Sequence, residues 1–228
     1  MGGRYIKDIV YGANDGIITT FAIVAGVAGA GIADPKTTII LLGVANVLAD
    51  GFSMAASDYL GSKSERDYVA NELKDEEREV FEDSKQERKE MEDMLKEQGY
   101  GGGDARTLTE LMFKKKKFFV DLMMYEAHNV STHGNSSPLK SALATFAAFV
   151  FAGLLPVAPF FILPASAEFF MYSTIATASA LFVVGALRSL FTKKSFVFSG
   201  VEMLVVGGVA ALIAYGVGMA LAGVTVAL

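Results

Sequence analysis

Five long apolar runs divide this chain, and each one is long enough to cross a lipid bilayer as a helix. They cover approximately residues 10–32, 38–61, 140–163, 167–191 and 199–226. A bilayer core of about 30 Å requires roughly 20 apolar residues in a helix. The pattern therefore predicts an all-α integral membrane protein with five transmembrane helices.

The acidic residues are concentrated between the second and third runs. Of the 25 acidic residues, 14 lie between Glu65 and Glu97, whereas only two follow Ser141. The second run has no turn signal at its end, so one long helix is expected to leave the membrane and enter the acidic stretch. We expect membrane helices in residues 1–63, a cytoplasmic acidic helical metal-binding insert in 64–134, and membrane helices again in 135–228.

Turn residues predict how this insert is organised. The stretch "YGGGD" (100–104) separates an acidic helical part from a later helix over 106–128, and "HGNSSP" (133–138) leads back to the membrane. A break near Ser84 would divide the acidic part into two shorter helices. With that break, the insert is expected to contain three helices.

Basic residues are unevenly distributed around the apolar runs. They precede the first run, separate the fourth from the fifth and fill the insert, whereas the opposite side has only Lys36. Basic residues mark the cytoplasmic side of a membrane. We therefore expect the N-terminus and the insert in the cytoplasm and the C-terminus outside. No organelle-targeting segment is recognisable, so we expect a multi-pass protein of a prokaryotic cytoplasmic membrane.

The composition excludes several classes of function. The chain contains no cysteine, so it has no disulfide, thiolate metal site or cysteine nucleophile. A ferritin-like di-iron oxidase needs Glu-x-x-His pairs on two helices, and neither His128 nor His133 stands three residues after a glutamate. No pattern indicates a nucleotide or nucleic-acid site. We expect a protein that is not an enzyme.

The apolar runs themselves carry polar residues at helical spacing. Asp15 lies in the first run, and Asn46, Asp50 and Met54 follow one another every four residues in the second. A charge at the bilayer centre costs at least about 2.5–3.5 kcal/mol, so it often marks a transport path. Carboxylates accept most divalent cations and a thioether adds affinity for transition metals, which favours Fe²⁺, Mn²⁺ or a neighbouring ion.

Each of these residues also has a purely structural interpretation. Asp15 could cap a helix near the interface. Asp50 could bond to the backbone or to Ser53, and Met54 could belong to a packed core. Asp58, one turn beyond Met54, is expected to be a solvated charge at the membrane surface.

The insert segregates its charges on a helical wheel. Counted from Glu72 at 100° per residue, several carboxylates fall within about 80° of one another and most basic residues lie opposite. They include Glu76, Glu79, Glu87 and Glu90. Like charges four residues apart destabilise a helix, so a bound cation would explain the arrangement. In the later helix, Met123 and Glu126 share a face and could ligate the same ion, or the methionines could form an apolar core.

Small residues recur every four positions in the first and fifth runs. They are Ala22, Gly26 and Ala30, and Ala210, Ala214, Gly218 and Ala222. Such faces let helix backbones approach closely in lipid. They predict close packing within one bundle or the seam of a dimer.

Four stretches resemble the vacuolar iron transporter family: "DGIITTFAIVAGVAGA", "ADGFSMAASDYLGSKSERD", "DLMMYEA" and "SGVEMLVVGGVAALIAYGVG". The resemblance covers about residues 8–226. It implies a homodimer of five-span subunits that exports Fe²⁺ from the cytosol in exchange for H⁺, along a path at the dimer interface. The family's path residues match Asp15 and Met54. Its cytoplasmic metal ligands match Glu76, Glu79, Glu87 and Glu90, and a Met-Met-Glu group on the later insert helix matches Met123, Met124 and Glu126.

Two positions depart from the family pattern. Asn46 stands where well-known members have a glutamate, and Asp50 is the candidate replacement in proton coupling. The Met-Met-Glu spacing is one residue shorter, which makes Met124 the less certain ligand. The sequence therefore predicts a proton-coupled exporter of Fe²⁺ or Mn²⁺, with a membrane-tethered metal sensor or store without transport as the alternative.

Overall fold

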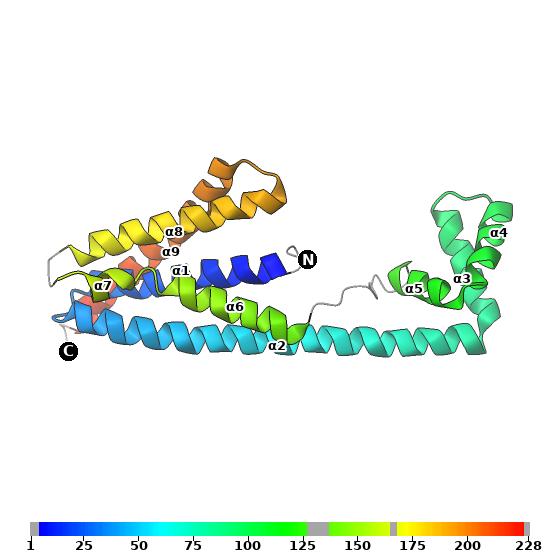
Figure 1. Ribbon diagram of the computed structural model, residues 1–228, viewed down its shortest axis with the longest axis horizontal. Coiled ribbons are helices and arrows are strands. Elements are labelled where there is room, and N and C mark those ends of the chain that lie inside the picture. The colour runs from blue at the N-terminus through cyan, green and yellow to red at the C-terminus, as the bar shows by residue number, and fades with distance from the viewer. Residues whose placement is uncertain (1–4, 127–136, 165–167, 226–228) are drawn as a thin grey trace. The chain divides into compact units, whose positions relative to one another are not determined.

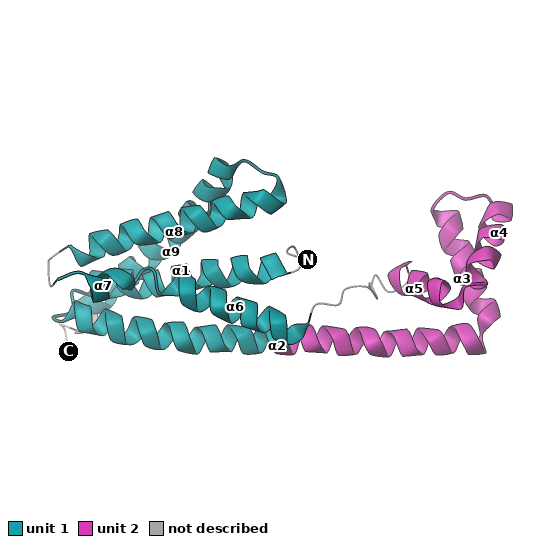
Figure 2. Ribbon diagram, viewed as in Figure 1, with its two compact units in different colours: residues 1–59, 136–228 teal, residues 60–135 magenta. Residues whose placement is uncertain are grey.

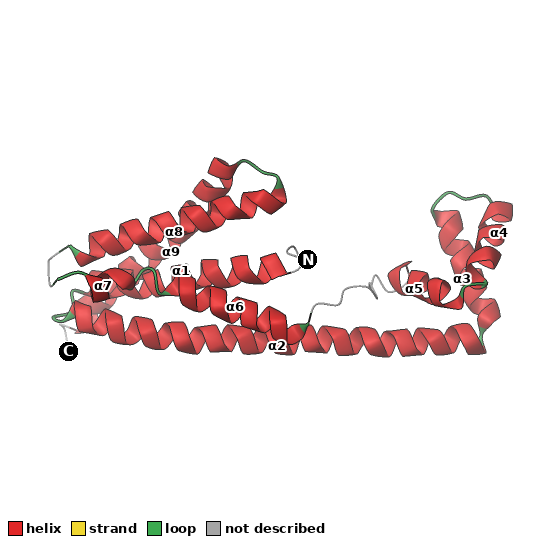
Figure 3. Cartoon of the chain, viewed as in Figure 1, coloured by secondary structure: helices red, strands yellow, loops and turns green. Residues whose placement is uncertain are grey.

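The computed structural model describes residues 5–126, 137–164 and 168–225, and in these ranges the chain is helical, without strands (Figures 1 and 3). The helices are α1 (Ile6–Ala30), α2 (Pro35–Glu82), α3 (Ser84–Glu97), α4 (Gly102–Phe113), α5 (Lys116–Glu126), α6 (Pro138–Gly153), α7 (Ala158–Ile162), α8 (Phe169–Thr192) and α9 (Phe196–Thr225). They form two compact units, unit 1 of residues 1–59 and 136–228 and unit 2 of residues 60–135 (Figure 2).

The long helix expected after the second apolar run is confirmed as α2, which is 48 residues long and unbroken in Figure 1. Proline occurs only at its first position, where the missing N–H group costs nothing. Asp34 accepts a hydrogen bond from the backbone N–H of Thr37 at 3.2 Å and so caps the start. The helix ends before Asp83, whose side chain accepts from the backbone N–H of Gln86 and caps α3. The break near Ser84 is therefore present.

Four helices in the described ranges are long and apolar enough to cross a membrane: α1, the first part of α2, α8 and α9. The third apolar run instead forms the 16-residue α6 and the short α7, with a turn between them. Pro156 lies in this turn, where it removes a backbone donor and obstructs a continuous helix. Five membrane crossings therefore remain a prediction.

In unit 1, α1 packs against α6, α8 and α9. A Cβ atom at Gly12 would stand 2.5 Å from the carbonyl oxygen of Thr145 on α6. A Cβ atom at Gly218 on α9 would collide with the carbonyl oxygen of Gly26 on α1. The small-residue faces thus serve packing inside the bundle.

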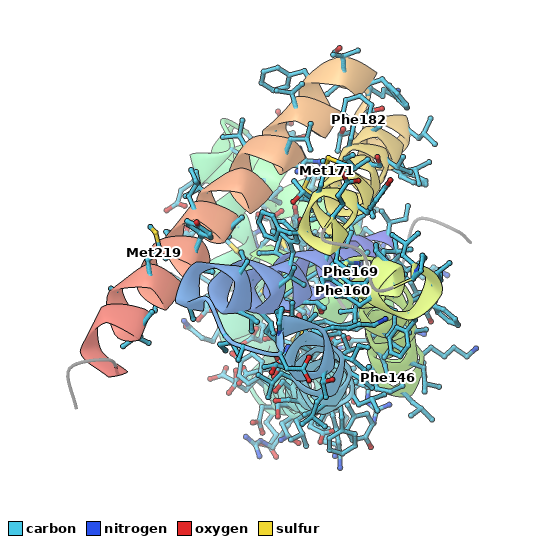
Figure 4. All side chains as sticks on the ribbon, turned by 90° about the vertical axis from the view of Figure 1, so that its left-hand side faces the viewer. Phe146, Phe160, Phe169, Met171, Phe182 and Met219 are labelled. Atoms are coloured by element: carbon cyan, nitrogen blue, oxygen red, sulfur yellow. The ribbon has the colours of Figure 1, made fainter. Side chains whose placement is uncertain are left out.

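The outer faces of unit 1 expose large apolar side chains, including Phe151 (76% exposed) and Leu212 (72%). Lipid accommodates such a surface, whereas water does not. Near one end of the bundle the rings of Phe160 on α7 and Phe169 on α8 stack with centroids 5.4 Å apart, as the end-on view in Figure 4 shows.

Unit 2 has a separate apolar core to which α2, α3, α4 and α5 all contribute. It consists of Val80, Met91, Phe113, Phe119, Val120, Met123 and Met124. The prediction of a single helix over 106–128 is wrong, because α4 ends at Phe113 and α5 begins at Lys116. The break itself consists of Lys114 and Lys115, and α5 begins with Lys116 and Lys117, so a continuous helix would hold four like charges close together. In its described residues, unit 2 therefore contains four helical segments rather than three helices.

Candidate metal-binding sites

The predicted polar residues of the first two spans lie on α1 and α2 of unit 1. Asp15 of α1 and Asp50 of α2 are both half-buried, and the charge of Asp50 acts on the Asp15 carboxylate. Thr19 Oγ1 donates a hydrogen bond at 2.8 Å to the backbone carbonyl of Asp15 and not to its carboxylate. Asp15 lies in the middle of α1 and is not an N-cap residue.

Asp50 belongs to a row of polar and sulfur-bearing side chains along α2. Asn46, Asp50 and Met54 are each half-buried and occupy successive turns of one helix. Met54 also lines a pocket of about 440 Å³ in unit 1. The other residues around this pocket are Lys7, Asp8 and Tyr11 of α1, Ser53, Ser57 and Asp58 of α2, and Thr145 of α6. The pocket thus places a thioether among carboxylates and hydroxyls.

The prediction that Asp58 is merely a solvated charge is wrong. Its Oδ2 atom accepts a hydrogen bond from Thr145 Oγ1 at 2.9 Å, and both residues line the Met54 pocket. Sequence reasoning missed this bond because the two residues are 87 positions apart. Their partnership depends on the packing of α6 on α2, which no local pattern reveals.

The remaining membrane carboxylate of α9 has a different partner. Glu202 forms an ion pair with Arg188 of α8. This pair links two adjacent helices of unit 1. Glu202 is therefore best explained as half of an interhelical ion pair.

In unit 2 the four predicted glutamates are unequal in burial. Glu76 of α2 is 2% exposed and Glu87 of α3 is 4% exposed. Glu79 and Glu90 are exposed, and Glu90 Oε1 accepts a hydrogen bond from Gln86 Nε2 at 2.8 Å. The chain turns at Asp83, between α2 and α3. Glu76 and Glu87 can therefore both be buried in the same unit although they lie on different helices.

Glu87 is the electrostatic centre of this group. Its burial, the charges of Glu76, Glu90 and Glu79, and a hydrogen bond with Glu76 raise its pKa to about 7. Its buried Oε2 atom has no hydrogen-bond partner among the described residues. A carboxylate that is buried, crowded by like charges and only partly satisfied is suited to bind a cation, which would relieve both the repulsion and the desolvation.

The predicted sulfur ligands lie in the core of the same unit. Met123 and Met124 of α5 are 1% and 0% exposed and pack with Val80 and Met91. Val80 is one turn beyond Glu76 on α2, and Met91 is one turn beyond Glu87 on α3. Glu126 differs from them, because it is the last residue of α5 and is exposed.

The arrangement is not a finished metal site. Within the ranges that the structure describes, no three histidine, aspartate or glutamate side chains are grouped closely enough to hold a metal ion as they stand. Side chains would have to turn inward around a cation. His128 and His133 lie outside the described residues.

Comparison with known proteins identifies the family. A sequence profile of the VIT family matches residues 6–219. The vacuolar iron transporter of Toxoplasma gondii is 36% identical over 223 residues, which span 94% of this chain and 73% of that protein. That of Plasmodium falciparum is 32% identical over 95% of this chain and 82% of its own length. Vacuolar iron transporter 1 of Tulipa gesneriana is 30% identical over 92% of this chain and 84% of its own length. The resemblance seen in the sequence is confirmed, and the chain belongs to the VIT family.

Proposed function

We propose that this chain transports divalent transition metal across a membrane, with Fe²⁺ as the main cargo and Mn²⁺ as a second one. The relatives that carry the name vacuolar iron transporter support this proposal. The observation that carries it is a half-buried carboxylate on each of two apolar helices, Asp15 and Asp50, with Met54 one turn beyond Asp50. A mixed set of carboxylate and thioether ligands suits transition metals better than Mg²⁺ or Ca²⁺. No enzymatic activity is part of the proposal.

Exchange for H⁺ is the second part of the proposal. A carboxylic acid must lose its proton before it ligates a metal, so metal and proton compete for the same group. Asp50 is the candidate coupling residue because it is a half-buried carboxylate whose charge acts on Asp15, whereas Asn46 offers only a neutral amide oxygen. The Glu/Met group of unit 2, namely Glu76, Glu79, Glu87, Glu90, Met123, Met124 and Glu126, would collect cytosolic metal for this path.

The proposed assembly is a homodimer in a prokaryotic cytoplasmic membrane, with the metal path at the dimer interface. The N-terminus and the insert would face the cytoplasm and the C-terminus the outside. The exposed apolar side chains of unit 1 leave surface for such a contact. Lipid covers the remaining apolar surface.

Uptake of Fe²⁺ into proteoliposomes that enclose a metal-quenched dye tests the transport proposal. An imposed pH gradient should accelerate quenching, and Asp15→Asn and Met54→Leu should each lower the initial rate by at least about tenfold. Met219→Leu is the matched control, since Met219 is an exposed methionine of α9. Uptake that is absent under every pH gradient would contradict the proposal.

A membrane-tethered metal sensor or store is the second candidate, and the burial of Glu76 and Glu87 favours it. In that case, replacing Glu76, Glu79, Glu87 and Glu90 by glutamine should abolish function while Asp15→Asn and Met54→Leu have little effect. A transporter should show the reverse order of severity. The same set of variants therefore separates the two candidates.

A further inference from the structure

Phe113, the last residue of α4, has two cations over its ring. The guanidinium carbon of Arg88 lies 3.9 Å from the ring centroid, and the ammonium nitrogen of Lys116 lies 3.6 Å from it. Both contacts are cation–π interactions of the kind that order aromatic and basic side chains.

Both cations are also held by other segments of unit 2. Arg88 Nη1 donates to Glu110 Oε1 at 2.9 Å and to Oε2 at 3.1 Å, which joins α3 to α4. Lys116 Nζ donates to the backbone carbonyl of Val80 at 3.5 Å, which joins α5 to the end of α2. We call Arg88, Glu110, Phe113 and Lys116 the Phe113 clamp. It connects all four helical segments of the unit.

The clamp is directly continuous with the sulfur-bearing core. The ring of Phe113 packs edge-on against Phe119 of α5, with centroids 5.1 Å apart and an interplanar angle of 81°. Phe119 is fully buried in the same cluster as Met123 and Met124. The position of α5, and with it the position of both thioethers, therefore depends on the clamp.

The carboxylates are positioned by other contacts. Glu76 and Glu87 lie on α2 and α3, on the two sides of the break at Asp83, and the Asp83 side chain caps α3 locally. The capped break at Asp83 therefore helps to place the carboxylates locally, whereas the placement of the sulfur atoms is set by the contacts of α4 and α5. Loss of the clamp should separate the two kinds of ligand without dispersing the carboxylates.

We propose that the Phe113 clamp sets the metal selectivity of unit 2 by positioning the Met123 and Met124 thioethers beside the Glu76 and Glu87 carboxylates. This inference rests on the proposed metal store. Carboxylates alone serve Ca²⁺ and Mg²⁺ as well as transition metals, and a nearby thioether shifts the preference toward transition metals. Arg88 and Phe113 are positioning residues in this scheme and do not touch the metal.

The test measures binding of Co²⁺ and Ca²⁺ to the purified full chain by calorimetry. Asp15→Asn and Met54→Leu are present in every sample, so that only unit 2 contributes to Co²⁺ binding. Phe113→Leu retains apolar bulk and removes the aromatic face. It should weaken Co²⁺ binding by about tenfold and leave Ca²⁺ binding within about twofold. Lys96→Gln, which breaks the exposed Lys96–Asp93 pair on the same α3, is the control and should change neither metal.

Met123→Leu should cause a selective loss of the same kind, and combining it with Phe113→Leu should add little, because Phe113→Leu already displaces the sulfur atom that Met123→Leu removes. Arg88→Gln provides a second way to open the clamp if circular dichroism shows that Phe113→Leu lowers the helix content. The inference would be overturned if Phe113→Leu weakened Co²⁺ and Ca²⁺ binding equally. It would also be overturned if the losses of Co²⁺ affinity in Phe113→Leu and Met123→Leu were fully additive. If Met123→Leu leaves Co²⁺ binding unchanged, the proposed store itself fails. If Met123→Leu acts but neither clamp variant does, only the clamp fails.

Discussion

At the scale of single residues, Glu87 combines burial with the charges of three neighbouring glutamates. Its pKa of about 7 means that near neutral pH the group is divided between its acid and its carboxylate. The folded protein holds this proton more tightly than the unfolded chain, in which a glutamate has a pKa near 4.5. A proton and a metal ion bound at Glu87 would therefore compete near neutral pH.

The stability and metal affinity of unit 2 should depend on pH in opposite directions. Without metal, the thermal unfolding temperature should fall as pH rises from about 5 to 7, because the folded state loses its additional proton in that window. Metal affinity should rise by up to about tenfold per pH unit below 7 and then level off. Thermal unfolding in EDTA measures the effect of pH on stability, and metal titration measures its effect on metal affinity. In a Glu87→Gln variant both pH dependences should disappear. If they persist, another group causes them.

At the scale of helices, α1 is held by backbone-to-backbone contacts along its whole length. Gly12 and Gly16 approach carbonyl groups of α6, and Gly26 and Gly29 meet α9. Such contacts require residues without a side chain and fix α1 relative to its neighbours. They therefore determine the separation of α1 from α6, which carries Thr145, the hydrogen-bond donor to Asp58.

Gly12→Ala should destabilise unit 1 by about 1–3 kcal/mol, because the added Cβ would force α6 away from α1. Gly208→Ala is the matched control, since a Cβ at that position meets nothing within 4 Å. Thermal unfolding in detergent measures the effect, and the initial rate of Fe²⁺ uptake should fall with it. Equal stability of the two variants would show that α1 and α6 can separate without cost.

The helices that the sequence predicted correctly are those whose boundaries depend on local signals. The absence of a turn signal after the second apolar run predicted the long α2, and the expected break near Ser84 is present. The break between α4 and α5 was missed because lysine is individually a good helix former, so only the repetition of its charge indicates an interruption. Spacing placed Glu76, Glu79, Glu87 and Glu90 on one helical face, but spacing does not reveal that only Glu76 and Glu87 are buried.

At the scale of the whole molecule, two units with separate cores perform the two parts of the proposed function. Unit 1 presents an apolar exterior and interior carboxylates, and unit 2 buries carboxylates and thioethers under a charged surface. The distribution of lysine and arginine predicts which side of the membrane each loop occupies. That topology can be tested directly because the chain has no native cysteine.

Single cysteines at exposed positions should map the topology in intact cells. Ala33→Cys, between α1 and α2, should react with a membrane-impermeant thiol reagent added outside. Lys114→Cys in unit 2 and Ser195→Cys between α8 and α9 should react only after the membrane is permeabilised. Labelling in the reverse pattern would show that the orientation is inverted, and the parent chain without cysteine gives the background.

The ion pair between Arg188 and Glu202 also bears on how the protein enters its membrane during synthesis. If α8 or α9 entered the bilayer alone, its charged residue would have no oppositely charged partner in the lipid. This would make insertion of the single helix less favourable. The pair forms only when α8 and α9 lie side by side, joined by the short turn after Thr192. Insertion of α8 and α9 as a hairpin would therefore bring the two charges into the lipid as a compensated pair.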